Sequence, residues 1–227
     1  MTSPALCIVV PVLNEAAGVS AALQALAPFK ARGVQVIVVD GGSSDGTVVL
    51  AEAGGVTVIL SPRGRALQMN AGANQSRAEV LLFLHADTLL PTVADQLIAQ
   101  ALASGQNVWG RFDVRIAGQS PMLRVVSGLM NLRSRLSGIA TGDQAMFMTR
   151  AAFDAVGGFA PQPLMEDIEM SKRLRQLSRP ACLRAKATTS GRRWDTHGVW
   201  RTVLLMWRLR FAYWRGAAPD QLAKLYR

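Results

Sequence analysis

The sequence predicts an α/β protein with a mostly parallel sheet between layers of helices. Short apolar, β-branched runs alternate with segments of helical periodicity through residues 6–84. Strands that are apolar along their whole length belong in a parallel sheet that helices cover on both faces. The 227 residues are enough for one domain with an elaboration. Hydrophobic residues make up 50% of the chain and charged residues 18%, which excludes a disordered protein.

Four strands and three helices are expected in the first part of the chain. The strands cover residues 6–10, 35–39, 56–60 and 80–84, and the helices cover 15–27, about 45–53 and 65–76. Ser43 or Ser44 can cap the second helix, which starts near Asp45. Ligands of such sheets bind beyond the carboxyl ends of the strands. Because Asp40 and Asp87 each follow a strand, we expect both carboxylates at the same edge of the sheet.

The rest of the chain is less regular. We expect helices at 91–103, 121–136, 165–177 and 199–214, and a short strand at 145–148. Residues 108–116 alternate between apolar and charged side chains, which is typical of a half-exposed strand, most often an antiparallel one. The helix at 165–177 begins with Glu166-Asp167 and ends in basic residues, so both ends match the helix dipole.

Positive charge is concentrated at the C-terminal end. The net charge is +10, and residues 171–227 contain 14 Lys or Arg against two acidic residues. Such a block favours anionic lipid, phosphate or nucleic acid as a partner, and a solvated basic face is the alternative. Nucleic acid is disfavoured because no recognised binding motif accompanies the charge. The two cysteines exclude a disulfide framework and fit a reducing compartment.

We expect a cytoplasmic protein, with peripheral contact to the inner membrane face as an open alternative. The first residues lack the pattern of a signal peptide, because no basic residue precedes the apolar run at 5–10. No stretch reaches 18 apolar residues, so no spanning helix is predicted.

Two loops at strand ends carry candidate chemistry. The segment from Asp40 to Thr47 is rich in glycine and opens a helix, whose N-terminus favours anions. It matches neither a dinucleotide-binding fingerprint nor a phosphate-binding Walker loop. Asp87, in His85-Ala86-Asp87, suits a hard divalent cation that also binds ligand phosphates. Each loop also has a purely structural interpretation as a turn or a helix cap.

Four segments in order make the sequence resemble family 2 glycosyltransferases. They are Val10-Pro11-Val12-Leu13-Asn14-Glu15, Val39-Asp40-Gly41-Gly42-Ser43-Ser44-Asp45-Gly46-Thr47, Leu84-His85-Ala86-Asp87-Thr88 and Glu166-Asp167. Further pieces look like a short, single-domain bacterial subgroup: Gly142-Asp143-Gln144, Gly157-Gly158-Phe159, Leu164-Met165-Glu166-Asp167 and Ser190-Gly191-Arg192-Arg193-Trp194. The resemblance covers about residues 5–175.

The resemblance implies a GT-A fold that binds a nucleoside diphosphate sugar. Pro11 and Glu15 would line the nucleoside pocket, and Asp40 would contact the base or ribose. Asp87 would match the last Asp of the family's Asp-x-Asp motif and hold Mn²⁺ or Mg²⁺, while His85 replaces the first Asp. The donor-binding residues implied in this way are Pro11, Asn14, Glu15, Asp40, Gly42, Arg63, Asp87, Arg193 and Trp194.

The resemblance also implies that the Glu166-Asp167 pair is catalytic, with Asp167 as the base. A hydroxyl group is a poor nucleophile, so a positioned carboxylate base accelerates its attack by about 10²–10⁴-fold. Adjacent acids repel each other, which raises one pKa, and the helix dipole opposes that rise. Arg63, Arg65 or Arg193 could help the metal to stabilise the leaving diphosphate. Direct attack by the acceptor would invert the anomeric centre.

The expected helix at 199–214 has two distinct stripes. Arginine recurs every seven residues along one stripe and tryptophan dominates another, which is typical of an interfacial helix. A helix docked on the sheet with snorkelling arginines is equally compatible. We therefore divide the chain into a glycosyltransferase domain at 1–195 and a basic amphipathic helical tail at 196–227.

The sequence thus favours a metal-dependent, inverting glycosyltransferase of hexosyltransferase type. Its donor would be a nucleoside diphosphate sugar and its acceptor an unidentified hydroxyl compound, with a lipid-linked acceptor as one candidate. The alternative is a non-catalytic nucleotide-sugar-binding protein or basic membrane adaptor on the same fold.

Overall fold

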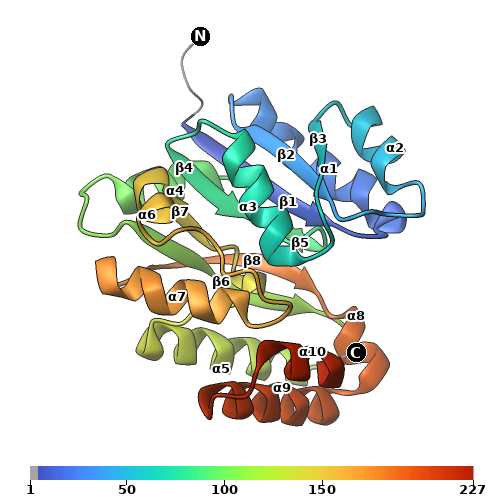
Figure 1. Cartoon of the computed structure of the whole chain (residues 1–227), viewed down its shortest axis with the longest axis vertical. Coiled ribbons are helices and arrows are strands. Elements are labelled where there is room, and N and C mark those ends of the chain that lie inside the picture. The colour runs from blue at the N-terminus through green and yellow to red at the C-terminus, as the bar shows by residue number, and fades with distance from the viewer. Residues whose placement is uncertain (1–4, 227) are drawn as a thin grey trace.

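An eight-stranded mixed sheet runs through the computed structural model, which describes residues 5–226 (Figure 1). The strands, in spatial order, are β3 (Thr57–Leu60), β2 (Gln35–Asp40), β1 (Leu6–Val12), β4 (Val80–Phe83), β7 (Phe147–Thr149), β6 (Trp109–Ala117), β8 (Ala181–Ser190) and β5 (Thr88–Leu89). Within the described chain, four neighbouring pairs are parallel and three are antiparallel. The predicted α/β class is confirmed.

The first four strands of the chain form the parallel half of the sheet. β1 pairs with β2 and β4, and β2 pairs with β3, all in parallel. The central side chains of β1, β2 and β4 are almost fully buried because helices cover both faces, whereas the edge strand β3 is only partly buried. Helix α1 (Ala16–Ala31) lies on one face, α3 (Arg65–Gln75) lies on the other, and α2 (Thr47–Ala53) packs beside α1.

Two local predictions in this half need correction. Helix α1 continues past Pro28, because Phe29 in its last turn is buried in the core. Helix α2 starts with Gly46 at its N-cap, and neither Ser43 nor Ser44 caps it. The Ser43 hydroxyl instead donates a hydrogen bond to the Asp40 carboxylate, which draws it away from the helix.

The second half of the sheet adds two strands that the sequence analysis missed, β8 and the two-residue β5. β8 pairs in parallel with β6, and its register shifts between Phe112 and Asp113. The expectation of a half-exposed antiparallel strand at 108–116 is correct only in part. β6 is antiparallel to β7 but parallel to β8, and Arg111 is completely buried. The helices of this half are α4 (Ala94–Leu102), α5 (Met122–Ser137), η1 (Gly142–Gln144), α6 (Arg150–Ala155), α7 (Glu166–Leu177), α8 (Arg192–His197), α9 (Val199–Trp214) and α10 (Pro219–Tyr226).

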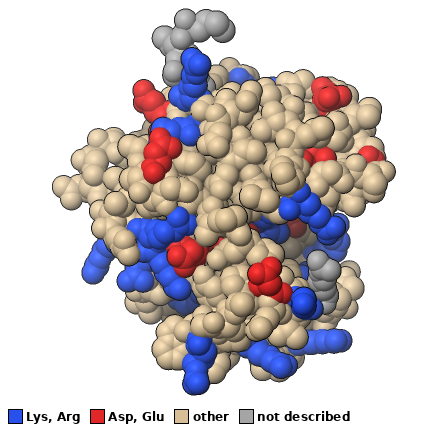
Figure 2. All heavy atoms as spheres, in the orientation of Figure 1, with Lys and Arg blue, Asp and Glu red and all other residues tan. Residues whose placement is uncertain are grey.

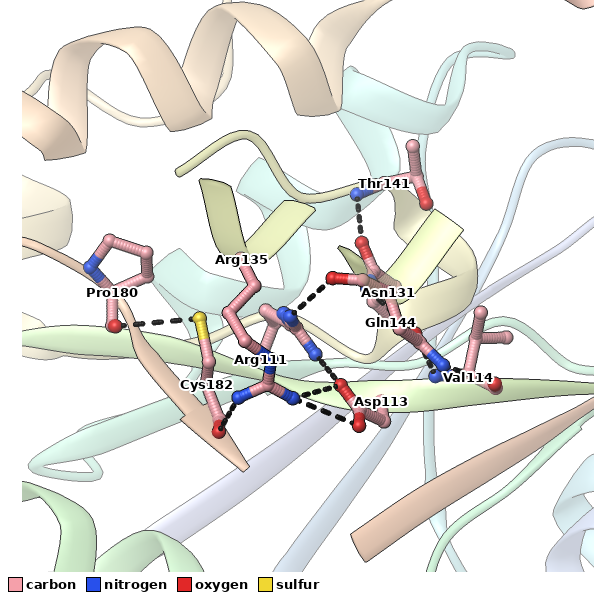
Figure 3. A network of polar contacts seen from close by, with 9 residues as sticks. All are labelled: Arg111, Asp113, Val114, Asn131, Arg135, Thr141, Gln144, Pro180 and Cys182. Carbon is pink, nitrogen blue, oxygen red and sulfur yellow. Dashed lines mark hydrogen bonds and ion pairs between the residues drawn. The ribbon is translucent and has the colours of Figure 1, made fainter. Parts of the chain in front are cut away.

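A polar network fastens α5 to β6 and explains the burial of Arg111 (Figure 3). Arg111 pairs with Asp113 on the same strand and donates to the Asn131 carbonyl of α5 at 3.2 Å. Arg135, one turn further along α5, donates to both oxygens of Asp113 at 2.8 and 3.0 Å. The Asn131 side chain exchanges two hydrogen bonds with the backbone of Val114. Paired buried charges of this kind fix the position of α5 on the sheet.

The C-terminal helices pack on the domain as a further layer, visible at the bottom of Figure 1. Leu209 of α9 and Leu222 of α10 are buried against Ile139 and against Met165 and Ile168 near the start of α7. The opposite side of α9 faces outward and remains exposed. Helix α9 therefore docks on the domain and also presents a free amphipathic face. None of the helices in residues 5–226 combines the length and apolarity that a membrane span needs.

Candidate functional site

A cavity of about 470 Å³ lies where the carboxyl ends of β1 and β4 meet the C-terminal helices. Pro11 and Glu15 line it from the end of β1, and residues 85–87 line it from the loop after β4. Glu166 and Asp167, at the start of α7, line another wall, and α5, η1, α8 and α9 complete the enclosure. The carboxyl edge of the parallel strands therefore holds the cavity, as expected for this architecture.

The cavity brings together most of the residues singled out from the sequence. Of these, the lining residues are Pro11, Glu15, Asp87, Glu166, Asp167, Arg193 and Trp194. Four others do not line it: Asn14, Asp40, Gly42 and Arg63. The cavity also includes charged residues that the sequence analysis did not place in a site, among them Arg133 and Asp143.

Asp40 lies at a strand end as predicted, but it does not share the cavity with Asp87. Its side chain is buried and accepts hydrogen bonds from the backbone N–H groups of Gly42 and Ser43, both at 2.8 Å. Gly42 has a φ of +90°, which allows the loop to fold back onto the carboxylate. In this structure the N–H groups of the turn bind the Asp40 carboxylate. A contact between Asp40 and a nucleotide-sugar donor stays a prediction.

Asn14 joins this loop to the loop after β1. Its backbone N–H donates to the Ser43 hydroxyl at 2.8 Å, and its side-chain oxygen accepts from the Ser44 N–H at 2.9 Å. Asn14 has a φ of +54°, a conformation that asparagine tolerates better than most residues. It therefore holds the backbone from which Glu15 reaches the cavity.

Asp167 has the environment of a general base. Its carboxylate accepts hydrogen bonds from the Gly142 N–H at 2.9 Å and from the Ile168 N–H at 2.7 Å. Burial and the adjacent charge of Glu166 nevertheless raise its pKa to about 6, against the opposing effect of those hydrogen bonds and of Arg65. A carboxyl group with this pKa is ionised at neutral pH and is more basic than an ordinary aspartate.

Glu166 is held differently from its neighbour. Its side chain is almost completely buried and pairs with Arg65 of α3, with 3.5 Å between Oε1 and Nη1. The carboxylate of Glu166 therefore links α7 to α3 and acts electrostatically on Asp167.

His85 and Asp143 form a second pair on the wall of the cavity. His85 Nδ1 lies 3.3 Å from Asp143 Oδ1. Burial alone would raise the pKa of Asp143, but the hydrogen bond and charge of His85, together with Arg65, hold it below its usual value. Gly142 packs so closely that a Cβ there would lie 2.3 Å from His85 Nε2. The sequence analysis named Asp143 only as part of a motif. Its partner, His85, lies 58 positions away in the chain, so local patterns did not indicate the pair.

Asp87 is the residue most suited to a divalent cation. Its side chain is exposed to the cavity, and the hydroxyl of the adjacent Thr88 approaches its carboxylate at 3.4 Å. Among residues 5–226, no group of three His, Cys, Asp or Glu side chains is placed to hold a metal ion alone. Mg²⁺ and similar cations need only one or two carboxylates when water and substrate phosphates complete the shell. The donor set therefore fits a cation shared with a bound diphosphate.

Arg193 and Trp194 close the cavity from α8. Arg193 donates to the Tyr226 carbonyl at 2.7 Å, and its guanidinium lies 3.8 Å from the centre of the Tyr226 ring. Trp194 packs among the apolar side chains between β6 and α5. These contacts join α8 to the last helix of the chain.

The comparisons with known proteins agree with this architecture. The model of the family described as "Glycosyl transferase family 2" matches residues 7–158. No protein of curated function matches the sequence.

Three solved structures with a similar fold illustrate the match. S. aureus TarS 1–349 has a TM-score of 0.65 at 18% identity, covering 82% of this chain and 60% of its own. The mannosyltransferase PcManGT from Pyrobaculum calidifontis, in complex with GDP-Man and Mn²⁺, has a TM-score of 0.67 at 19% identity, covering 99% and 69%. Glucosyl-3-phosphoglycerate synthase from Mycobacterium tuberculosis, in complex with Mn²⁺, UDP and phosphoglyceric acid, has a TM-score of 0.62 at 17% identity, covering 82% and 69%. The chain thus spans about 60% of the length of TarS 1–349.

Proposed function

Because the chain belongs to glycosyl transferase family 2, we propose that it transfers a sugar from a nucleoside diphosphate sugar to a hydroxyl group of an acceptor. The observation that carries this proposal is the meeting of Asp87 and Asp167 in one cavity at the carboxyl edge of the sheet. One carboxylate is exposed for a cation and the other has the pKa of a base. The neighbouring structures bind GDP-Man, UDP-GlcNAc and UDP, which supports a nucleotide-sugar donor here.

The donor would occupy the side of the cavity formed by Pro11, Glu15 and Asp87. Burial and the charge of Asp87 raise the pKa of Glu15, and the charge of Arg192 opposes that rise. All three side chains line the cavity. Asp87 would hold Mn²⁺ or Mg²⁺, and the cation would neutralise charge on the leaving diphosphate. Arg192 is the adjacent cationic side chain that this part of the cavity offers to phosphate oxygens.

Asp167 would activate the acceptor from the opposite wall. As the acceptor oxygen forms its bond to the anomeric carbon, the bond from that carbon to the diphosphate oxygen breaks. Asp167 takes the proton of the acceptor hydroxyl, and the nucleoside diphosphate leaves with the electron pair. A single displacement of this kind inverts the anomeric centre. The two N–H donors on Asp167 fix the direction of its carboxylate.

The first test is turnover of a panel of nucleoside diphosphate sugars, with and without Mn²⁺. We expect D167N to lower transfer by about 10²–10⁴-fold, because the base is lost. Donor binding should persist, since the donor contacts lie elsewhere, and a thermal-shift titration measures it. Equal turnover in D167N would refute the role of Asp167. Donor binding without turnover by the wild type would favour a non-catalytic nucleotide-sugar-binding protein or basic membrane adaptor.

We further propose peripheral contact with an anionic membrane surface, through the outward faces of α5 and α9. On α9, Trp200, Leu204, Trp207, Phe211 and Trp214 are each 60–75% exposed and recur at spacings of three and four residues. Arg201, Arg208 and Arg215 border this stripe and are exposed. Tryptophan beside arginine on one helix is the pattern of an interfacial helix, and the arginines complement anionic headgroups.

A further inference from the structure

Among residues 5–226, two nitrogen atoms of the Arg133 side chain, on α5, have no hydrogen-bond partner. The side chain lines the cavity, and both atoms, Nε and Nη2, are buried. Burying a charged group without a partner is costly, because the group loses its hydration. A guanidinium in this position is therefore ready to gain from an anion that enters the cavity.

Two other cationic groups of the cavity are already engaged. Arg65 pairs with Glu166, and Arg193 binds the carbonyl and the ring of Tyr226. Arg192 acts on Glu15, on the side where the donor is proposed to bind. Arg133 instead acts on Asp167: burial lowers the pKa of Arg133, and the Asp167 carboxylate opposes that change. Both side chains line the cavity, so the charge of Arg133 shares the cavity with the proposed base.

Arg133 cannot easily retreat from this position. Two residues before it, Asn131 is bonded to β6 through three hydrogen bonds, and two residues after it, Arg135 is bonded to Asp113 (Figure 3). These contacts hold the backbone of α5 on both sides of Arg133. The charge is preorganised, and preorganisation reduces the entropic cost of binding a ligand.

The surroundings of Arg133 are mainly apolar. Val126 and Met130 from α5 line this part of the cavity, and the wall contributed by α9 is largely apolar as well. The α9 lining residues are Thr202, Val203, Met206, Trp207, Leu209 and Arg210. A cation among apolar walls suits an anionic group carried by an apolar or compact molecule, and arginine matches phosphate oxygens in particular.

We propose that Arg133 binds a phosphate group of the acceptor, so that the acceptor's hydroxyl is directed to Asp167. This inference rests on the proposed transferase function. The phosphate could belong to a lipid headgroup or to a free phosphate ester, and the same guanidinium would recognise both.

Calorimetric titration of the intact chain tests the subsite without relying on turnover. The probes are inorganic phosphate, hexyl phosphate and hexanol, each added after the donor side is saturated with the nucleoside diphosphate that stabilises the chain most. We expect both phosphates to bind the wild type and hexanol to bind much more weakly. R133Q should weaken phosphate binding by about 10–100-fold, because a charge-assisted hydrogen-bonding partner is lost.

Two further variants make the result specific. R133K keeps the charge and should recover part of the affinity, whereas R124Q removes an exposed arginine of the same helix and should bind phosphate as the wild type does. Equal phosphate affinity in R133Q and the wild type, or no phosphate binding by the wild type, would overturn the proposal. Tighter binding of hexyl phosphate than of inorganic phosphate supports a lipid source, and equal binding supports a free phosphate ester.

The titration also separates this inference from the proposed function. A chain that binds phosphate through Arg133 but turns over no donor would refute the transferase and leave the anion site standing. A chain that transfers sugar with R133Q unaffected in phosphate binding and in acceptor KM would refute the anion site alone.

Discussion

Three aspartates at the ends of strands or helices show how local surroundings separate similar residues. Asp40 is enclosed by its own turn, Asp87 is exposed to the cavity, and Asp167 is half-buried beside another acid. The first stabilises a loop, the second suits a cation, and the third suits proton transfer. Their residue type and their place at the ends of regular elements were visible in the sequence, but their exposure was not.

The pH dependence of transfer should report the Asp167 carboxyl group. A base must be deprotonated, so kcat/KM should fall as the pH drops through about 6. In E166Q the acidic limb should move to lower pH, because the Glu166 charge helps to raise the pKa of Asp167 and Arg65 would then favour the ionised form more strongly. The pH profile of kcat/KM in single-turnover and steady-state assays measures this shift.

The control for this experiment is E169Q, which removes an acid of the same helix that lies outside the cavity lining. Its acidic limb should stay near that of the wild type. A limb that stays in place in E166Q would mean that another group controls the profile.

The residues of the candidate site could be predicted only where one short segment of the sequence contains a recognisable motif. Asp87 and Asp167 each end or begin a recognisable element, and both line the cavity. Asp143 acquires its role from His85, and Arg133 acquires its role from a cavity that α7 and α9 complete. Such roles depend on contacts between distant segments, which periodicity and local motifs do not specify.

At the scale of elements, a strand or helix could be predicted where its sequence is an unbroken apolar run or has a clear helical period. The four strands of the parallel half and α9 were anticipated within a few residues, because unbroken apolar runs or strong helical periodicity mark them. β8 was missed because it reads Ala-Cys-Leu-Arg-Ala-Lys-Ala-Thr-Thr-Ser, in which polar residues interrupt the run. It forms as a strand because β6 supplies a long parallel partner.

Two glycines in helices should respond in opposite ways to the same substitution. In α5, a Cβ at Gly128 would meet nothing within 4 Å, so G128A should raise the free energy of unfolding by about 0.5–1 kcal/mol through helix propensity. In α3, a Cβ at Gly72 would lie 2.4 Å from a Val9 methyl group and 2.9 Å from a Val39 methyl group. G72A should therefore destabilise the protein by about 1–3 kcal/mol through overpacking.

Urea denaturation of the two variants and the wild type measures both changes. The pair is its own control, because the chemical change is identical and both sites are helical. Destabilisation by G128A would contradict the open surroundings of Gly128, and a neutral G72A would show that α3 can move away from β1.

At the scale of the whole molecule, charge and exposed apolar surface are concentrated on the same layer. Lys and Arg side chains border the lower part of the face shown in Figure 2, where the C-terminal helices lie. On α5, Val125, Leu129, Leu132 and Leu136 form a second outward stripe, each 51–79% exposed. Both helices with outward apolar stripes also line the cavity. A membrane contact here would place the cavity next to the lipid.

The last prediction concerns this layer. The chain should sediment with vesicles of phosphatidylcholine and phosphatidylglycerol, and less with phosphatidylcholine alone, because the arginines attract anionic headgroups. Added salt should weaken the binding. Replacing Trp200, Leu204, Phe211 and Trp214 together by serine should abolish the binding while leaving the fold intact, since all four side chains are exposed.

The control replaces four exposed apolar side chains elsewhere, Val49, Leu60, Val93 and Leu177, by serine and should leave sedimentation unchanged. Substitution is preferable to removal of the C-terminal helices, because Leu209 and Leu222 belong to a buried cluster. Equal sedimentation of the two quadruple variants would show that α9 serves the core alone.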